Sequence, residues 1–188
     1  KTGSEYDLRK IFDNTLLKAH PRSTVTFVDN HDSQPGESLE SFIEPWFKEI
    51  AYGLILLRQK GYPCIFYGDF YGTGGEHSQP GFKEAIKTLA KIRNKFAYGD
   101  QDDYFDSPSC IGWVRHGDEN HPDKCAVLIS TGDMSTLRMF VGEGESGKIY
   151  ADYTGNNDAH VHIGDDGFGS FMVGPGSLSV WVEGGTDL

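Results

Sequence analysis

The first hundred residues alternate between short apolar runs and amphipathic segments. Residues 23–28 are β-branched and aromatic, a composition typical of a strand. Apolar side chains recur at helical spacing over residues 44–60, and a glycine and a proline then stop the helix. Residues 64–67 predict a second strand and residues 81–97 a second helix. The order strand, helix, strand, helix indicates parallel βα units, and two such units cannot close a barrel by themselves.

From residue 103 onward the pattern changes to short runs in which apolar and polar side chains alternate. Polar, glycine-rich turns separate the runs, as is typical of an antiparallel sandwich or small barrel. The predicted strands cover residues 111–115, 125–129, 136–141, 148–150, 169–173 and 177–182. We therefore divide the chain into residues 1–102 and residues 103–188.

Charge supports the same division. The chain has 188 residues and a net charge of −11, from 28 Asp and Glu against 17 Lys and Arg. Residues 103–188 hold 14 acidic and 4 basic residues, and residues 1–102 hold 14 and 13. An acidic protein of this kind is a poor partner for nucleic acid or for an anionic membrane surface. No apolar run approaches the roughly 18 residues that span a bilayer, and no apolar signal core follows the first residues.

The three cysteines, Cys64, Cys110 and Cys125, are widely spaced. This spacing predicts neither a disulfide framework nor a zinc site. Cys64 and Cys125 lie in apolar runs, so we expect both to be buried core thiols. Free cysteines favour a cytoplasmic protein slightly over a secreted one, and the compartment otherwise stays open.

Candidate chemistry follows the first predicted strand. In parallel βα architectures, functional groups collect beyond the carboxyl ends of the strands. Here the segment Asp29-Asn30-His31-Asp32-Ser33-Gln34 brings two carboxylates, an imidazole and two amides together. From position and density alone, a functional site and a polar capped turn are equally good interpretations. Asp69, after the second strand, fits a tight turn better.

Several motifs nevertheless point to one family. Residues 27–32 (FVDNHD), followed by Gln34-Pro35-Gly36, resemble the last conserved motif of the α-amylase family of glycoside hydrolases. Residues 44–69 are similar to the liquefying α-amylases in particular, and shorter matches extend the resemblance over nearly the whole chain. The resemblance implies an α/β plus all-β fold: the last two βα units of a (β/α)8 TIM barrel in residues 1–102, then a C-terminal antiparallel Greek-key β-sandwich domain in residues 103–188.

The resemblance also implies roles for the residues of the motif. Asp32 matches the carboxylate that stabilises the transition state at the cleaved sugar, and His31 matches a histidine that donates to the same sugar. Asn30 and Gln34 are weaker candidates for substrate binding. Asn30 fits a role in supporting the loop better than a contact with substrate, and Gln34 could line the cleft. Asp29 matches no active-site position, so we expect a structural role for it.

The implied reaction is the retaining endo-hydrolysis of α-1,4-glucosidic bonds in starch or glycogen. It needs a nucleophilic carboxylate and an acid/base carboxyl, which the family places on earlier barrel strands, and no motif here resembles either. We therefore expect a fragment of a longer enzyme that is inactive alone. Its expected partners are an α-glucan (starch, glycogen or maltooligosaccharides) and the remainder of the barrel or a second copy, with no nucleic acid and no membrane. The alternative is a non-catalytic carbohydrate-binding or structural β module.

Calcium is the cofactor that the family implies, and its main ligands there lie in an inserted domain that this chain does not resemble. A second family site uses carbonyls that match Ser4, Tyr6 and Pro108, with aspartates where this chain has Ser109 and Thr131. Because Ca²⁺ prefers anionic oxygen ligands, we predict no metal site within this chain. His160 and His162 lack a third ligand, so they predict an exposed strand face. The aromatic residues of the second part are expected to pack in its core rather than to stack on sugar; they are Tyr150, Tyr153, Phe168, Phe171 and Trp181.

Overall fold

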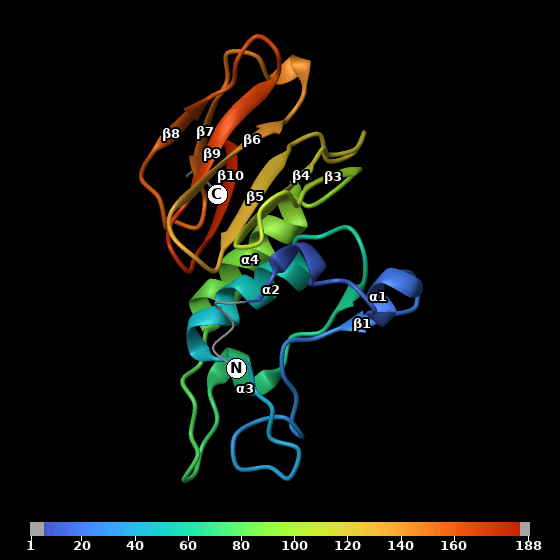
Figure 1. Cartoon of the computed structure of the whole chain (residues 1–188), viewed down its shortest axis with the longest axis vertical. Helices are drawn as coiled ribbons and strands as arrows, with labels where there is room; N and C mark the ends of the chain where they lie inside the picture. Colours follow the sequence, from blue (N-terminus) through green and yellow to red (C-terminus); the bar gives the residue numbers. More distant parts are fainter. Residues whose placement is uncertain (1–5, 185–188) are drawn as a thin grey trace.

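The computed structural model describes residues 6–184. Helices α2 and α4 lie between the antiparallel sheets and the loops that surround α3 (Figure 1). The elements of the first part are η1 Leu8–Lys10, α1 Leu16–Ala19, β1 Val25–Thr26, η2 Pro45–Phe47, α2 Lys48–Leu56, β2 Tyr62–Pro63, α3 Tyr67–Tyr71 and α4 Lys83–Phe96. The two long helices lie within the segments in which the apolar spacing predicts them.

The first part contains one parallel βαβ unit. Strands β1 and β2 pair in parallel, with Val25 opposite Tyr62, and α2 connects them. The strand predicted at residues 64–67 is misplaced, because the observed strand ends at Pro63, before the predicted one begins. The amide of Tyr62 donates to Thr24 O and that of Cys64 to Thr26 O, so pairing with β1 fixes the strand at Tyr62–Pro63. The chain then turns into α3, which begins at Tyr67.

The second part contains two antiparallel sheets. A six-stranded sheet has the order β3-β4-β5-β10-β7-β8, and β6 pairs with β9 in a two-stranded sheet. The strands are β3 Gln101–Tyr104, β4 Cys110–Arg115, β5 Cys125–Ser130, β6 Ser135–Phe140, β7 Ile149–Asp152, β8 His160–His162, β9 Phe168–Val173 and β10 Leu178–Glu183. The six predicted strands are present. Strand β3 was not predicted, and it crosses residue 102, so the boundary placed there divides a strand.

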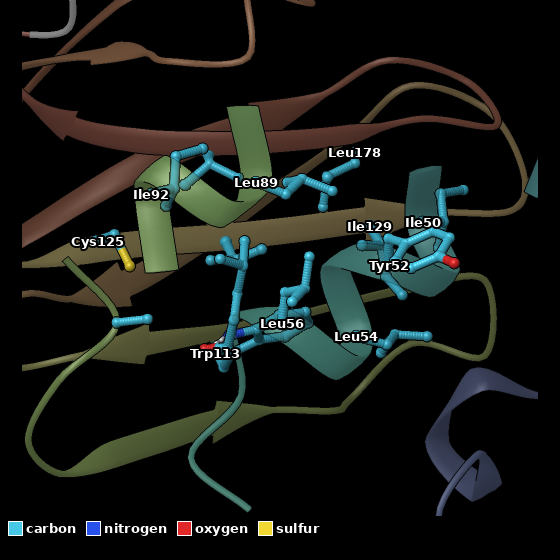
Figure 2. Close-up of a cluster of buried hydrophobic side chains, with 14 of the residues drawn as sticks. Ile50, Tyr52, Leu54, Leu56, Leu89, Ile92, Trp113, Cys125, Ile129 and Leu178 are labelled. Carbon is cyan, nitrogen blue, oxygen red and sulfur yellow. Dashed lines mark hydrogen bonds between the residues drawn. The ribbon is translucent and has the colours of Figure 1, made fainter. Parts of the chain in front are cut away.

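The central strands are buried on both faces, which makes the fold three layers deep. In β5, the side chains of Cys125, Val127 and Ile129 belong to one apolar cluster together with α2 and α4 (Figure 2). The alternate side chains, Ala126 and Leu128, belong to a second cluster against the sheet of β6 and β9. The period of two along a strand produces this division. The helices of the first part therefore cover one face of the six-stranded sheet.

Three of the five aromatic residues considered as a sugar platform, Tyr150, Phe171 and Trp181, are fully buried. The prediction of core packing is confirmed for them. The prediction for Cys125 is also confirmed, and desolvation by burial raises the pKa of its thiol to about 12. The prediction for Cys64 is wrong, since this residue is exposed. It lies just beyond β2, whose sheet has no third strand among the described residues.

A buried carboxylate stabilises the turn before β7. Glu145 accepts hydrogen bonds from Tyr150 Oη at 2.8 Å and Lys148 Nζ at 3.1 Å, and Lys124 Nζ lies 3.5 Å away. Burial pushes the pKa of Glu145 up, but these partners outweigh burial and hold the pKa below its usual 4.5. The carboxylate therefore stabilises the fold above pH 4.5, and this contribution is lost as the pH falls through the lowered value.

We expect Glu145→Gln to lower the free energy of unfolding at pH 7 by about 1–3 kcal/mol, because charge-assisted hydrogen bonds are lost in a buried setting. The difference from the unaltered chain should narrow as the pH falls from 4.5 through the lowered pKa of Glu145, because the unfolded chain takes up this proton before the folded chain does. Urea unfolding followed by circular dichroism between pH 3 and pH 7 measures both effects. Glu143→Gln is the control, because Glu143 is exposed in the same 3-10 turn. Equal losses for both variants at pH 7 would refute the role of Glu145.

Candidate functional site

The loop that follows β1 presents two polar side chains to solvent. The side chain of His31 is 83% exposed and that of Asp32 is 60% exposed. His31 Nε2 lies 3.4 Å from Asp32 Oδ1, so the imidazole and the carboxylate form one polar pair. Both side chains are therefore accessible to solvent on the loop that follows the carboxyl end of β1.

Asn30 holds this pair in place by an Asx turn. Its Oδ1 accepts hydrogen bonds from the backbone amides of Asp32 at 3.0 Å and Ser33 at 2.9 Å, and its own backbone amide donates to Ser33 Oγ at 3.1 Å. The side-chain oxygen of Asn30 is therefore occupied within the loop. Asn and Asp favour such turns because the side chain imitates a backbone carbonyl. In this structure Asn30 supports the backbone that carries Asp32.

Gln34 lies at the inner side of the same loop. Its amide nitrogen donates to Glu37 Oε1 at 3.3 Å, and its backbone amide donates to Asn30 O at 3.2 Å. Gln34 also lines a small cavity next to Asp29, Lys48 and Asp69. Of the four candidates, His31 and Asp32 share one exposed face, whereas Asn30 and Gln34 are half-buried behind them.

Below the loop lies a buried ionic cluster. Lys48 Nζ, at the start of α2, contacts the carboxylates of both Asp29 and Asp69. Tyr52 Oη donates to Asp69 Oδ2 at 2.7 Å and accepts from the amide of Phe66 at 3.3 Å. Burial and the hydrogen bond to Asp69 raise the pKa of Tyr52, so the phenol stays protonated and remains a donor. Each carboxylate is thus satisfied without water.

Sequence reasoning missed Lys48. A signal for it exists, because Lys48 and Tyr52 are four residues apart and lie on the same side of a mostly apolar helix. A lysine on the buried side of a helix needs a carboxylate partner. Asp29 was expected to be structural, and in this structure its side chain is buried in the cluster.

The described part of the chain shows no metal centre. Within residues 6–184, no three His, Cys, Asp or Glu side chains come together in a way that could hold a metal ion. His160 and His162 are exposed on β8. Of the positions that match the second calcium site, Ser4 lies outside the described residues, and Pro108 O accepts the amide of Leu8 at 2.8 Å. Ser109 and Thr131 supply no carboxylate, so this donor set does not fit calcium.

None of the helices within residues 6–184 combines the length and the apolar character that crossing a membrane requires.

Comparison with known proteins decides the family. Residues 135–182 match the model of the α-amylase C-terminal domain. The chain is 48% identical over 184 residues to a glucan 1,4-alpha-maltohexaosidase of Bacillus sp. (strain 707), covering 97% of this chain and 35% of the relative. The chain carries an α-amylase C-terminal domain. It is also 46% identical over 183 residues to the α-amylase of Geobacillus stearothermophilus, covering 97% of this chain and 33% of that enzyme.

The resemblance to liquefying-type α-amylases is therefore confirmed over almost the whole chain. The chain spans about a third of the length of these two relatives. A solved structure, that of the cyclomaltodextrin glucanotransferase CldA, has the same fold, with a TM-score of 0.66 and 21% identity over 96% of this chain and 41% of that one. The match to the α-amylase C-terminal model covers the strands from β6 to β10, and the two relatives match the remaining strands and the first part as well.

Proposed function

We propose that this chain supplies the last two βα units of a (β/α)8 barrel and the C-terminal Greek-key β sandwich of an α-amylase. In this proposal it takes part in the retaining endo-hydrolysis of α-1,4-glucosidic bonds in starch or glycogen. The observation that carries the proposal is the exposed pair of His31 and Asp32 at the carboxyl end of β1, where barrel enzymes bind substrate. The parallel pair β1–β2 linked by α2 supports the assignment to a barrel.

Exposed apolar side chains on the first part support the same assignment. Val25, Phe27 and Tyr62, which lie in or beside the parallel strands, are 56%, 53% and 75% exposed. Apolar residues of parallel strands are normally buried, so we expect another part of the protein to cover this surface. The remaining strands of a barrel, or a second copy of the chain, would provide it.

Each polar residue of the loop has a distinct role in the proposal. The carboxylate of Asp32 hydrogen-bonds sugar hydroxyls and stabilises the positive charge that develops on the ring in the transition state. His31 donates to the same sugar, Asn30 fixes the turn and Gln34 lines the cleft. The nucleophile and the acid/base carboxyl, and the calcium ligands of the whole enzyme, come from other segments.

The main alternative is a carbohydrate-binding module in which aromatic residues of the second part stack on glucan. Burial argues against it, because Trp181 is fully buried and its Nε1 donates to Met172 O at 3.0 Å. A buried indole has no face for a sugar ring. The catalytic interpretation is therefore the better supported one.

A chimaera tests the proposal. The segment of the Geobacillus stearothermophilus α-amylase that matches this chain is replaced by the chain itself, and reducing-sugar release from soluble starch is measured. We expect the chimaera to hydrolyse starch and the 188-residue chain alone to release no sugar above background. A folded chimaera without activity would contradict the proposal, and activity of the chain alone would mean that it carries its own nucleophile and acid.

A further inference from the structure

The side chain of Asp29 closes the base of the loop that carries His31 and Asp32, and a backbone hydrogen bond from Ser41 N to Ser33 O at 3.0 Å closes the loop further out. Asp29 precedes the loop, and its carboxylate oxygens accept the amide of Ile43, at the far end of the loop, at 3.2 and 3.3 Å. Asp29 is three residues from Asp32, and the Asx turn of Asn30 joins the two. A shift of the Asp29 carboxylate is therefore transmitted through this short segment to Asp32.

Lys48 in turn fixes Asp29. The exposed fractions of the Lys48, Asp29 and Asp69 side chains are 8%, 4% and 6%, so the cluster is screened from water. Its one ammonium group lies between two carboxylates from different elements: Asp29 follows β1, and Asp69 belongs to α3, the helix that follows β2. Without the ammonium, two buried negative charges would face each other and separate. Separation would move the base of the loop relative to α3.

We propose that Lys48 is a positioning residue for Asp32. Its bridge between Asp29 and Asp69, which we call the clamp, holds the loop of residues 30–42 in the position that transition-state stabilisation by Asp32 requires. The role of Lys48 in catalysis rests on the function proposed above. The clamp itself rests only on the observed contacts of Lys48 with the two carboxylates. Placement of this kind is worth a great deal, since a displacement of about 1 Å at a reacting group can lower a rate about 100-fold.

The clamp is tested first on the 188-residue chain by amide hydrogen exchange. Lys48→Met should speed exchange about tenfold or more at Ile43, Asp32 and Ser33, because their hydrogen bonds depend on the clamp. Amides of β5 should exchange as before. The control is Lys91→Met, an exposed lysine of α4, which should change neither set. If Lys48→Met does not fold, Asp29→Asn tests the same clamp, because it keeps an acceptor for Ile43 but removes the charge that binds Lys48.

The positioning role is tested in the chimaera by measuring the effects of Lys48→Met on kcat and on KM separately. Lys48→Met should lower kcat about 100-fold in fully folded enzyme and change KM by less than about threefold. A purely structural lysine would lower the unfolding midpoint and leave kcat per folded molecule unchanged. Unchanged exchange at Ile43, or an unchanged kcat in an active chimaera, would overturn the inference. Faster exchange together with an inactive unaltered chimaera would refute the proposed function and leave the clamp standing.

Discussion

Trp113→Ala is expected to lower the free energy of unfolding by about 3–5 kcal/mol, a large share of the roughly 5–15 kcal/mol that stabilises an ordinary domain. Trp113 lies in β4 and is fully buried where the sheet meets the helices (Figure 2). Its Nε1 donates to Leu57 O, just after α2, at 3.3 Å, and the guanidinium of Arg58 lies 5.3 Å from its ring centre. Truncation to alanine removes the apolar packing of the indole between the sheet and the helices, one hydrogen bond and one cation–π contact.

The same substitution tests whether the two parts of the chain fold as one unit. Arg115 Nη1 also donates to Leu57 O, at 3.2 Å, so side chains of β4 bind the carboxyl end of α2 directly. We therefore expect one cooperative transition in urea, with helical and sheet signals lost together. Trp46→Ala is the control: Trp46 is 40% exposed, and we expect a loss below about 1 kcal/mol. Two separate transitions, or equal losses for both tryptophans, would contradict the shared core.

Local sequence pattern predicted those elements whose own residues determine their structure. The uninterrupted apolar run Cys125–Ile129 indicates a central strand, and the structure shows it buried on both faces. Strand β3 (QDDY) escaped prediction because its residues are polar and half-exposed at a sheet edge. Strand β8 (HVH) was considered only as an exposed strand face, since three residues give little periodic signal. The shift of β2 to Tyr62–Pro63 arises from its register with β1, which no local pattern contains.

In the candidate site, too, the sequence predicted one part and not the other. The motif of residues 27–32 placed His31 and Asp32 beyond a strand, and the structure has both there. The buried cluster could not be predicted in this way, because Lys48 finds Asp29 and Asp69 at separations of 19 and 21 residues. Only the parallel pairing of β1 and β2 brings these carboxylates to one edge. A lysine on an apolar helix face indicates that a partner exists without indicating which one.

The measurement that tests the central claim most directly is the kcat of the starch-hydrolysing chimaera with Asp32→Asn. Asparagine has nearly the same volume as aspartate but no charge. Because the Asp32 side chain is 60% exposed, we expect the substitution to leave the fold intact. We expect kcat to fall by about 10³-fold or more, as for the loss of one transition-state stabilising group, with circular dichroism unchanged.

The matched control is Asp158→Asn, an exposed aspartate remote from the loop in sequence, which should leave kcat within about twofold. A fall of three orders of magnitude for Asp32→Asn alone is the result that the account predicts. Retention of kcat within tenfold by folded Asp32→Asn enzyme would contradict it, because the exposed carboxylate after β1 would then take no part in the reaction.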